Sequence, residues 1–154
     1  IEKLCAYSEA GAIVQADIDA VAEPTMEAVV FEITDAMGQR DFSRALERLD
    51  VMFKLQPEAI PILAAIGNQM RRLNAAKTLM NAGKTADDLA QLYSLAPFAA
   101  NKTMSQARRL SERFCSRAVL LCSDTDFKLK RSYDDPKRLL EMLILTLAEE
   151  ARHD

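Results

Sequence analysis

The chain has 154 residues, of which 49% are hydrophobic and only four are glycine, which suits one globular domain with a sizeable core and excludes a disordered chain. The formal net charge of −3 and the acidic pI of about 5.3 argue against a dedicated nucleic-acid-binding protein. The three cysteines are odd in number and form no C-x-x-C pair, and no secretory signal is visible, so we expect a reducing, cytoplasmic location.

The first 24 residues are expected to belong to a different domain from the rest. The chain begins at Ile1 without a methionine, and its opening residues are typical of the middle of an amphipathic helix, so we interpret the sequence as a fragment. A short second helix is expected up to Glu23. The residue before a proline avoids helical angles, so the Glu23-Pro24 step places the boundary between a domain at 1–24 and one at 25–154.

Two short helices open the second domain. Thr25 supplies an N-cap hydroxyl to a helix that ends at Gly38, and Asp41 supplies a carboxylate to the next helix. The connection is only a few residues long, which predicts an antiparallel hairpin. The apolar residues expected to face inward are Met26, Val29, Val30, Ile33 and Met37 in the first helix and Phe42, Ala45, Leu46, Leu49 and Phe53 in the second.

The longest predicted helix lies in the middle of the chain. Pro61 fits its first turn, where backbone N–H groups have no intrahelical acceptor, and Gly83 provides the left-handed residue that ends it. Thr85 then caps a short helix with its hydroxyl, and the helix dipole favours Asp88 in the first turn. The inward face of the long helix is expected to be Ile62, Ile66, Met70, Leu73, Ala76 and Met80.

Two more helices follow this segment. Pro97 starts a helix that runs to Leu110, and Ser111 caps a further helix that continues to about Arg131. Their expected inward faces are Ala96, Ala100, Met104, Ala107 and Leu110, and then Phe114, Ala118, Leu121 and Thr125. The small residues of the first face predict close helix packing. Cys115 and Cys122 lie seven residues apart and are expected on one buried face.

The last helix is the most apolar part of the chain. Asp135 and Pro136 supply its cap and first-turn proline. The run LLEMLILTLA from Leu139 is too short to cross a bilayer and is expected to be buried on most sides, whereas the polar tail AEEARHD is expected to fray. No stretch alternates apolar and polar residues over strand length, so the sequence predicts an all-α bundle of six or seven helices.

Basic residues are concentrated in the middle of the chain. Residues 71–117 hold nine basic and three acidic side chains, whereas the segments before and after are net negative. Such a surface approaches DNA phosphates or an acidic neighbouring subunit, or it is an ordinary solvated face. The candidate DNA or subunit contacts are Arg71, Arg72, Lys102, Arg108 and Arg109.

The sequence offers little to an enzyme. It has no G-x-x-x-x-G-K-[ST] loop, no G-x-S-x-G and no H-E-x-x-H, and its only histidine is His153 near the end, so we expect no catalytic residue, metal or cofactor. Adjacent acids on a helix point in different directions, so paired acids are expected to be caps or solvated groups. These pairs are Asp87-Asp88, Asp134-Asp135 and Glu149-Glu150.

The alternative function is a DNA-binding helix-turn-helix at residues 85–109. The segment has the outline of that motif, in which the N-terminal polar residues of the second helix contact base edges. Here these positions carry Pro97-Phe98-Ala99-Ala100, which favours two helices packed in a bundle. The polar residues of the second helix are Asn101, Lys102, Gln106, Arg108 and Arg109.

A structural interaction module fits the apolar pattern better. Several helices, above all the one containing LLEMLILTL, carry apolar stripes wider than a small bundle needs. The surplus apolar surface is therefore expected to meet another chain.

Five segments together resemble a known family. They are VFEITDAMGQRDFSRALERLD, PILAAIGNQMRRL, AAKTLMNAGKTADDLAQLYSL, PFAANKTMSQARRLS and DTDFKLKRSYDDPKRLLEMLIL. Their order and spacing resemble the C-terminal part of the delta subunit of bacterial DNA polymerase III, a clamp-loader component. The resemblance covers the chain from about Met26 onward and, more weakly, the segment before it.

The resemblance implies a fold and a role. It implies a helical, collar-like bundle at 25–154, preceded by the tail helices of a small lid-like domain at 1–24. Proteins of this family hold the sliding clamp open for loading onto primed DNA during replication, while their C-terminal helices join a ring-shaped collar of clamp-loader subunits.

The resemblance also implies partners. Other clamp-loader subunits bind through the collar and handle ATP, and the sliding clamp binds an N-terminal domain that this sequence lacks. Primer-template DNA is a further contact in the full complex, and no membrane is involved. The chain would then be a non-catalytic part of a nucleotidyltransferase complex.

Overall fold

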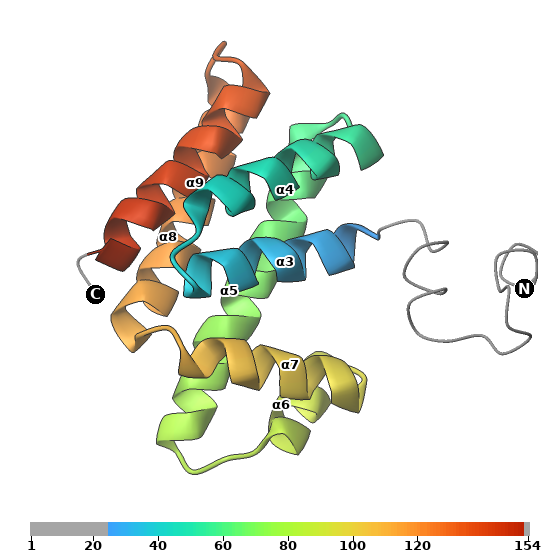
Figure 1. Cartoon of the computed structure of the whole chain (residues 1–154), viewed down its shortest axis with the longest axis vertical. Helices are drawn as coiled ribbons and strands as arrows, with labels where there is room; N and C mark the ends of the chain where they lie inside the picture. The colour runs from blue at the N-terminus through green and yellow to red at the C-terminus, as the bar shows by residue number, and fades with distance from the viewer. Residues whose placement is uncertain (1–24, 153–154) are drawn as a thin grey trace, which may run out of the picture.

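The predicted all-α bundle is confirmed. The computed structural model describes residues 25–152, and within that range it contains helices and no strand (Figure 1). The helices are α3 (Met26–Gly38), α4 (Phe42–Leu55), α5 (Ala59–Asn81), α6 (Ala86–Tyr93), α7 (Pro97–Arg108), α8 (Glu112–Arg131) and α9 (Pro136–Arg152). The helices expected within residues 1–24 lie outside the described range.

Helix α5 forms the axis of the bundle. Its 23 residues span about 35 Å, and it packs against α3, α6, α7 and α8. Figure 1 shows α5 passing behind α3 and α7. The predicted inward face is buried, except that Met80 is only half-buried. Leu63, Gly67 and Gln69 are buried as well, because α5 has neighbours on several sides.

The α3–α4 hairpin forms with the predicted caps. The Thr25 hydroxyl accepts a hydrogen bond from the Ala28 N–H at 3.2 Å, and the Asp41 carboxylate accepts one from the Arg44 N–H at 3.1 Å. Gly38 ends α3 as predicted, but the left-handed residue of the turn is Arg40, with a φ of 60°. Met52 is buried in α4, which the predicted face did not include.

The stop between α5 and α6 also agrees with the prediction. Gly83 has a φ of +68°, and the Lys84 N–H donates to the Leu79 carbonyl at 2.8 Å, which closes the end of α5. Thr85 and Asp88 form a capping box in which the Asp88 carboxylate accepts the Thr85 backbone N–H at 2.8 Å.

The α7–α8 corner brings the small-residue stripe into the core. Ala100, Met104, Ala107 and Leu110 are buried, but Ala96 is exposed because it is the N-cap residue of α7 and precedes its first turn. Ser111 caps α8 by accepting the Phe114 N–H at 3.0 Å. Cys115 and Cys122 are both buried, as predicted, whereas Cys5 lies outside the described residues.

Helix α9 differs from its prediction at both its outer face and its end. Leu140, Ile144 and Leu147 are buried, but Met142 is 52% and Leu145 is 46% exposed, so burial on most sides was wrong. The expectation of a frayed tail was also wrong up to Arg152, because the buried Ala148 and Ala151 hold this part of α9 against the bundle.

Candidate interaction surface

The acidic side chains of α3 form ion pairs with arginines from other parts of the bundle. Each of these acids lies within ion-pair distance of an arginine, and each arginine belongs to a different helix or its C-cap. The pairs are Glu27 with Arg72 of α5 at 3.3 Å, Glu32 with Arg48 of α4 at 3.3 Å, and Asp35 with Arg109, the C-cap residue of α7, at 3.7 Å. Two of the five candidate contact residues are therefore already paired within the fold.

The other candidate residues do not converge on one site. The Lys102 ammonium lies 4.7 Å from the centre of the Phe31 ring, which is a cation–π contact with α3. Arg71 hydrogen-bonds the Asn68 side chain and lines a groove between α5 and α8, away from Arg72. Arg108 is exposed near the end of α7.

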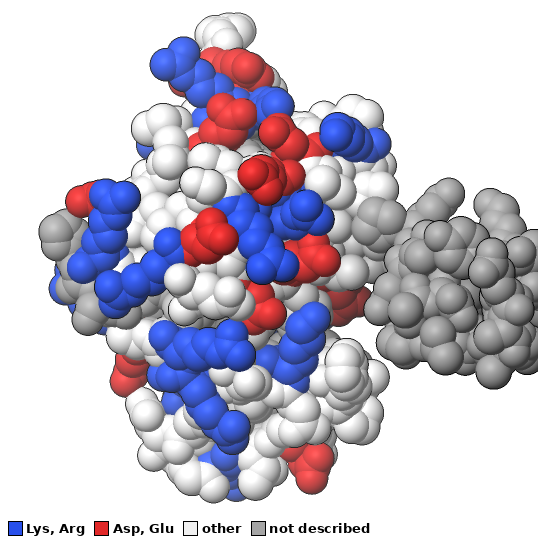
Figure 2. Space-filling view, in the orientation of Figure 1, with Lys and Arg blue, Asp and Glu red and all other residues white. Residues whose placement is uncertain are grey.

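Helix α7 nevertheless carries a basic surface. The chain has no acidic residue from Leu89 to Ser111, so the cations of α7 have no acid on their own helix. Figure 2 shows Lys and Arg side chains gathered where α7 runs, whereas the surface above it, over α3 and α4, mixes both signs. Of the five candidate residues, Lys102 and Arg108 lie on α7 and Arg109 directly follows its last residue.

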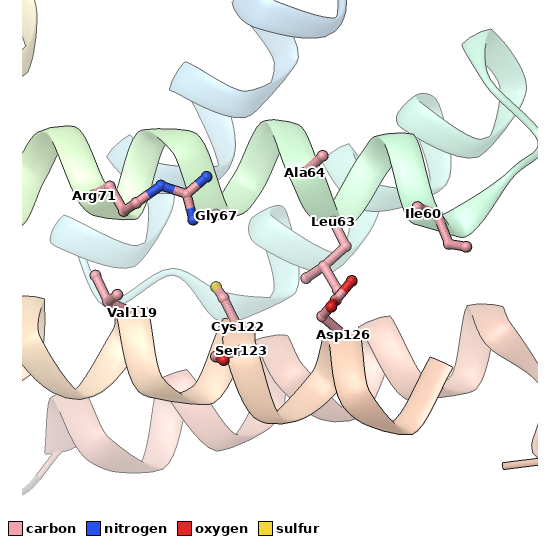
Figure 3. A pocket seen from close by; sticks show the side chains of 9 residues that line it. All are labelled: Ile60, Leu63, Ala64, Gly67, Arg71, Val119, Cys122, Ser123 and Asp126. Carbon is pink, nitrogen blue, oxygen red and sulfur yellow. The ribbon is translucent and has the colours of Figure 1, made fainter. Parts of the chain in front are cut away.

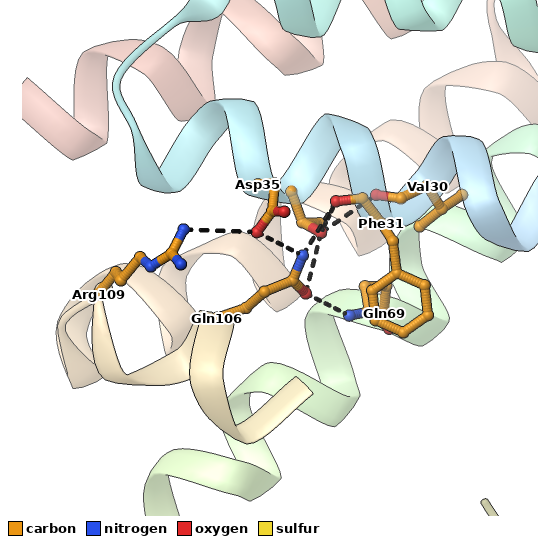
Figure 4. Close-up of polar contacts among 7 residues, drawn as sticks. Val30, Phe31, Asp35, Gln69, Gln106 and Arg109 are labelled. Carbon is orange, nitrogen blue, oxygen red and sulfur yellow. Dashed lines mark hydrogen bonds and ion pairs between the residues drawn. The ribbon is translucent and has the colours of Figure 1, made fainter. Parts of the chain in front are cut away.

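Gln106 is the centre of a buried hydrogen-bond network (Figure 4). Its amide nitrogen donates to the Phe31 carbonyl at 2.9 Å and to the Asp35 carboxylate at 3.0 Å. Its amide oxygen accepts from Gln69 at 3.0 Å and lies 3.2 Å from the Thr34 hydroxyl. One side chain of α7 is thereby tied to α3 and α5. Sequence reasoning missed this role, although a glutamine at a core-facing helical position was a visible signal.

The same network argues against the helix-turn-helix alternative. Gln106, one of the polar residues expected on a DNA-reading helix, is only 3% exposed and fully engaged inside the bundle. The Asn101 side-chain N–H donates to the Pro97 carbonyl, and the start of α7 exposes the apolar Phe98 side chain. Base readout requires exposed donors and acceptors at these positions, so this alternative is not favoured.

The outer sides of α8 and α9 carry apolar side chains that the bundle does not cover. Leu120 and Phe127 of α8 are exposed, as are Met142 and Leu145 of α9. A shallow groove of about 140 Å³ runs between the two helices, and Leu121, Leu139 and Met142 are among the residues that line it. We call the set Leu120, Phe127, Met142 and Leu145 the outer α8–α9 face.

A second and larger groove lies on the other side of α8. It has a volume of about 390 Å³ and runs between α5 and α8 (Figure 3). Gly67 and Cys122 lie opposite each other in it, with Arg71 toward one end and Ile60 and Asp126 toward the other. Burial raises the pKa of the Cys122 thiol to about 12, although the nearby Arg71 charge opposes the shift.

Two of the paired acids, Asp88 and Asp135, act at helix starts as predicted, whereas Glu150 is partly buried in an ion pair rather than capping or fully solvated. Asp88 belongs to the capping box, and the hydrogen bond from the Thr85 backbone holds the pKa of its carboxyl below the ordinary value. Asp135 accepts the Lys137 N–H at the start of α9, and Glu150 pairs with Arg117 at 3.1 Å. Among residues 25–152, no three His, Cys, Asp or Glu side chains are grouped to hold a metal ion. Nor is any helix in this range long and apolar enough to cross a membrane.

Comparison with known proteins agrees with the helical fold and the order of its segments. The family model for the DNA polymerase III delta subunit, C-terminal domain, matches residues 27–147. The DNA polymerase III subunit delta of Bacillus subtilis (strain 168) is 26% identical over 148 residues, which cover 96% of this chain and 43% of that protein. A solved structure of the Bacillus subtilis DNA clamp loader delta protein superposes with a TM-score of 0.83 at 26% identity, covering 96% of this chain and 44% of that one.

The chain therefore spans less than half the length of these two relatives. The family match nevertheless extends from α3 into α9. The resemblance inferred from the sequence segments is confirmed, and this chain belongs to the family of the DNA polymerase III delta subunit, C-terminal domain.

Proposed function

We propose that this chain is the oligomerisation domain of a clamp-loader delta subunit and joins a helical collar with the other clamp-loader subunits. The observation that carries the proposal is the family match over residues 27–147. The names of the two Bacillus relatives, a DNA polymerase III subunit and a DNA clamp loader protein, support a role in DNA replication.

Within the full-length protein, this domain would bind the other clamp-loader subunits, and another region would act on the sliding clamp. The relatives are more than twice as long as this chain, so they have room for a preceding domain that opens the sliding clamp. The domain itself then needs no catalytic group, because ATP is bound and hydrolysed by neighbouring subunits. Primer-template DNA is reached in the assembled complex, in the cytoplasm.

The outer α8–α9 face is the surface that we assign to the collar contact. Its four members are exposed apolar side chains, and complete burial of one such side chain contributes about 1.5–3 kcal/mol. Met142 is 52% and Leu145 is 46% exposed, so a partner that covers both gains about 1.5–3 kcal/mol in total before the costs of binding are subtracted.

Co-elution tests this assignment. Full-length delta protein containing this domain is mixed with the ATPase subunits of its own clamp loader and separated by size-exclusion chromatography. The double variant Met142→Asp, Leu145→Asp should leave the complex, because two carboxylates would have to be buried at the contact. The control Leu92→Asp changes an apolar residue of α6 that is 61% exposed, more than either Met142 or Leu145, and should still co-elute. Unchanged co-elution of the double variant would remove the face from the collar.

The basic surface of α7 forms a second, weaker contact in this proposal. Lys102, Arg108 and Arg109 face either DNA phosphates or an acidic surface of a neighbouring subunit, and Arg71 and Arg72 lie outside this group. If the partner is DNA, Arg108→Gln should lower the salt dependence of DNA binding by the assembled clamp loader by about one charge. An unchanged salt slope with weakened subunit assembly would instead identify an acidic protein surface.

The division into domains at 1–24 and 25–154 also belongs to this proposal. A boundary there predicts that mild proteolysis of the chain first cuts near Pro24 and leaves a stable C-terminal fragment. First cuts inside α3 to α9, identified by mass spectrometry, would speak against it.

A further inference from the structure

The groove between α5 and α8 has features of a binding site. Its volume of about 390 Å³ lies within the range of roughly 300–1,000 Å³ that is usual for ligand sites. Leu63, Val119 and Cys122 give it an apolar wall and floor, and Figure 3 shows the Cys122 sulfur directed toward α5 at Gly67. None of these residues belongs to the outer α8–α9 face, so the groove is separate from the surface assigned to the collar.

Gly67 has no side chain to fill the groove, although the fold has room for a Cβ atom at this position. It lies inside α5, where glycine costs about 0.5–1 kcal/mol relative to alanine. A Cβ atom at this position would be 3.7 Å from both Arg71 Nη1 and Cys122 Cβ, which is ordinary van der Waals contact. Neither crowding nor backbone conformation therefore requires the glycine, and close approach of another molecule would account for it.

The charges that line the groove indicate that the bound molecule carries an anionic group. The Arg71 guanidinium reaches along α5 toward Gly67 and donates a hydrogen bond to the neutral side-chain amide of Asn68. Within residues 25–152, no carboxylate lies within ion-pair distance of Arg71. At the opposite end, Asp126 is paired with Lys130 at 2.6 Å. The groove thus offers an uncompensated cation at one end only.

We propose that the α5–α8 groove binds a short segment of a partner protein that inserts a large apolar side chain over Gly67 and places a carboxylate against Arg71. The apolar side chain contacts Leu63, Val119 and Cys122. The carboxylate accepts hydrogen bonds from the guanidinium, which is suited to bidentate recognition of this group. This goes beyond the collar assembly, because it involves the opposite side of α8 and a peptide rather than a helical neighbour.

Peptide selection followed by affinity measurement tests the proposal. A random twelve-residue phage-displayed library is panned on the 154-residue chain and counter-selected on Gly67→Leu, which fills the groove. The enriched peptides should pair a large apolar residue with an Asp or Glu within about two positions. Fluorescence anisotropy of the best labelled peptide should show binding at least tenfold weaker with Gly67→Leu and with Arg71→Gln.

Controls separate the groove from the rest of the surface. Arg108→Gln removes an exposed cation on α7, and the pair Met142→Asp, Leu145→Asp alters the outer α8–α9 face, so both should bind the peptide unchanged. Replacing the peptide's acidic residue by its amide should cancel the effect of Arg71→Gln, as a double-mutant cycle requires.

The proposal is overturned if no sequence is enriched against the Gly67→Leu counter-selection, or if the enriched peptides lack acidic residues. It is equally overturned if they bind Arg71→Gln as tightly as the unchanged chain. Circular dichroism confirms that each variant is folded. Should Gly67→Leu be unfolded, panning without counter-selection and the Arg71→Gln comparison still decide the outcome, because Arg71 is exposed and its replacement leaves the core intact.

Discussion

Replacing two glycines by alanine should change the stability of this domain in opposite directions. Gly67→Ala removes the conformational cost of a glycine inside α5 and adds a methyl group at ordinary contact distance, so the free energy of unfolding should rise by about 0.5–1 kcal/mol. Gly83→Ala forces a Cβ atom into a backbone conformation with φ of +68°, which costs about 1–2 kcal/mol. No atom lies within 4 Å of the added Cβ at Gly83, so that cost is purely a backbone effect.

The two variants should therefore differ by roughly 2 kcal/mol in urea unfolding monitored by circular dichroism at 25 °C. The slope of unfolding free energy against urea should be the same for both, since neither variant changes the surface exposed on unfolding. A destabilised Gly67→Ala variant would refute the reasoning, because it would mean that α5 and α8 approach each other more closely than 3.7 Å at this point.

Three more predictions concern single groups. Gln106→Leu should lower the free energy of unfolding by about 2–4 kcal/mol in urea titrations, because it leaves buried partners on α3 and α5 unsatisfied, and a loss under about 1 kcal/mol would contradict the network. The folded-state pKa of Asp88 lies below its ordinary value of 3.8, so its contribution is present above about pH 4 and disappears as the pH falls through the folded pKa. The melting temperatures of the unchanged chain and Asp88→Asn should accordingly differ at pH 7 and converge as the pH falls below the folded-state pKa of Asp88; a constant difference would contradict this. With its pKa near 12, the buried Cys122 thiol should resist an aromatic disulfide reagent at pH 8 and react after unfolding, whereas rapid native reaction would indicate an open groove floor.

The helix ends could be predicted because their chemistry is local. Thr25, Asp41 and Ser111 each cap the helix assigned to them, since an N-cap needs only a side-chain oxygen and an N–H three residues later. Gly83 could likewise be identified as a stop from its position after the last periodic residue. The family resemblance could also be inferred, because it depends on the order and spacing of segments along the sequence and needs no tertiary contact.

The contacts that define the candidate surfaces could not be predicted in this way. Gln69 and Gln106 are 37 residues apart, and their pairing depends on how α5 and α7 cross. Met142 is exposed because no other helix among the described residues covers its side of α9. Hydrophobic periodicity alone does not reveal how many sides of a helix are covered. The five candidate contact residues lie in one stretch of the sequence. In the structure, however, Arg71 and Arg72 line different grooves on different sides of α5.

The ion pairs of α3 change how the charge of this domain can be used. Arg72 and Arg109 already face Glu27 and Asp35, so an incoming anion must first displace a carboxylate that is tethered in place. Helix α3 thereby behaves as a built-in competitor that lowers the apparent affinity of this surface for any polyanion. The excess of positive charge counted along residues 71–117 consequently overstates the number of counterions that binding would release.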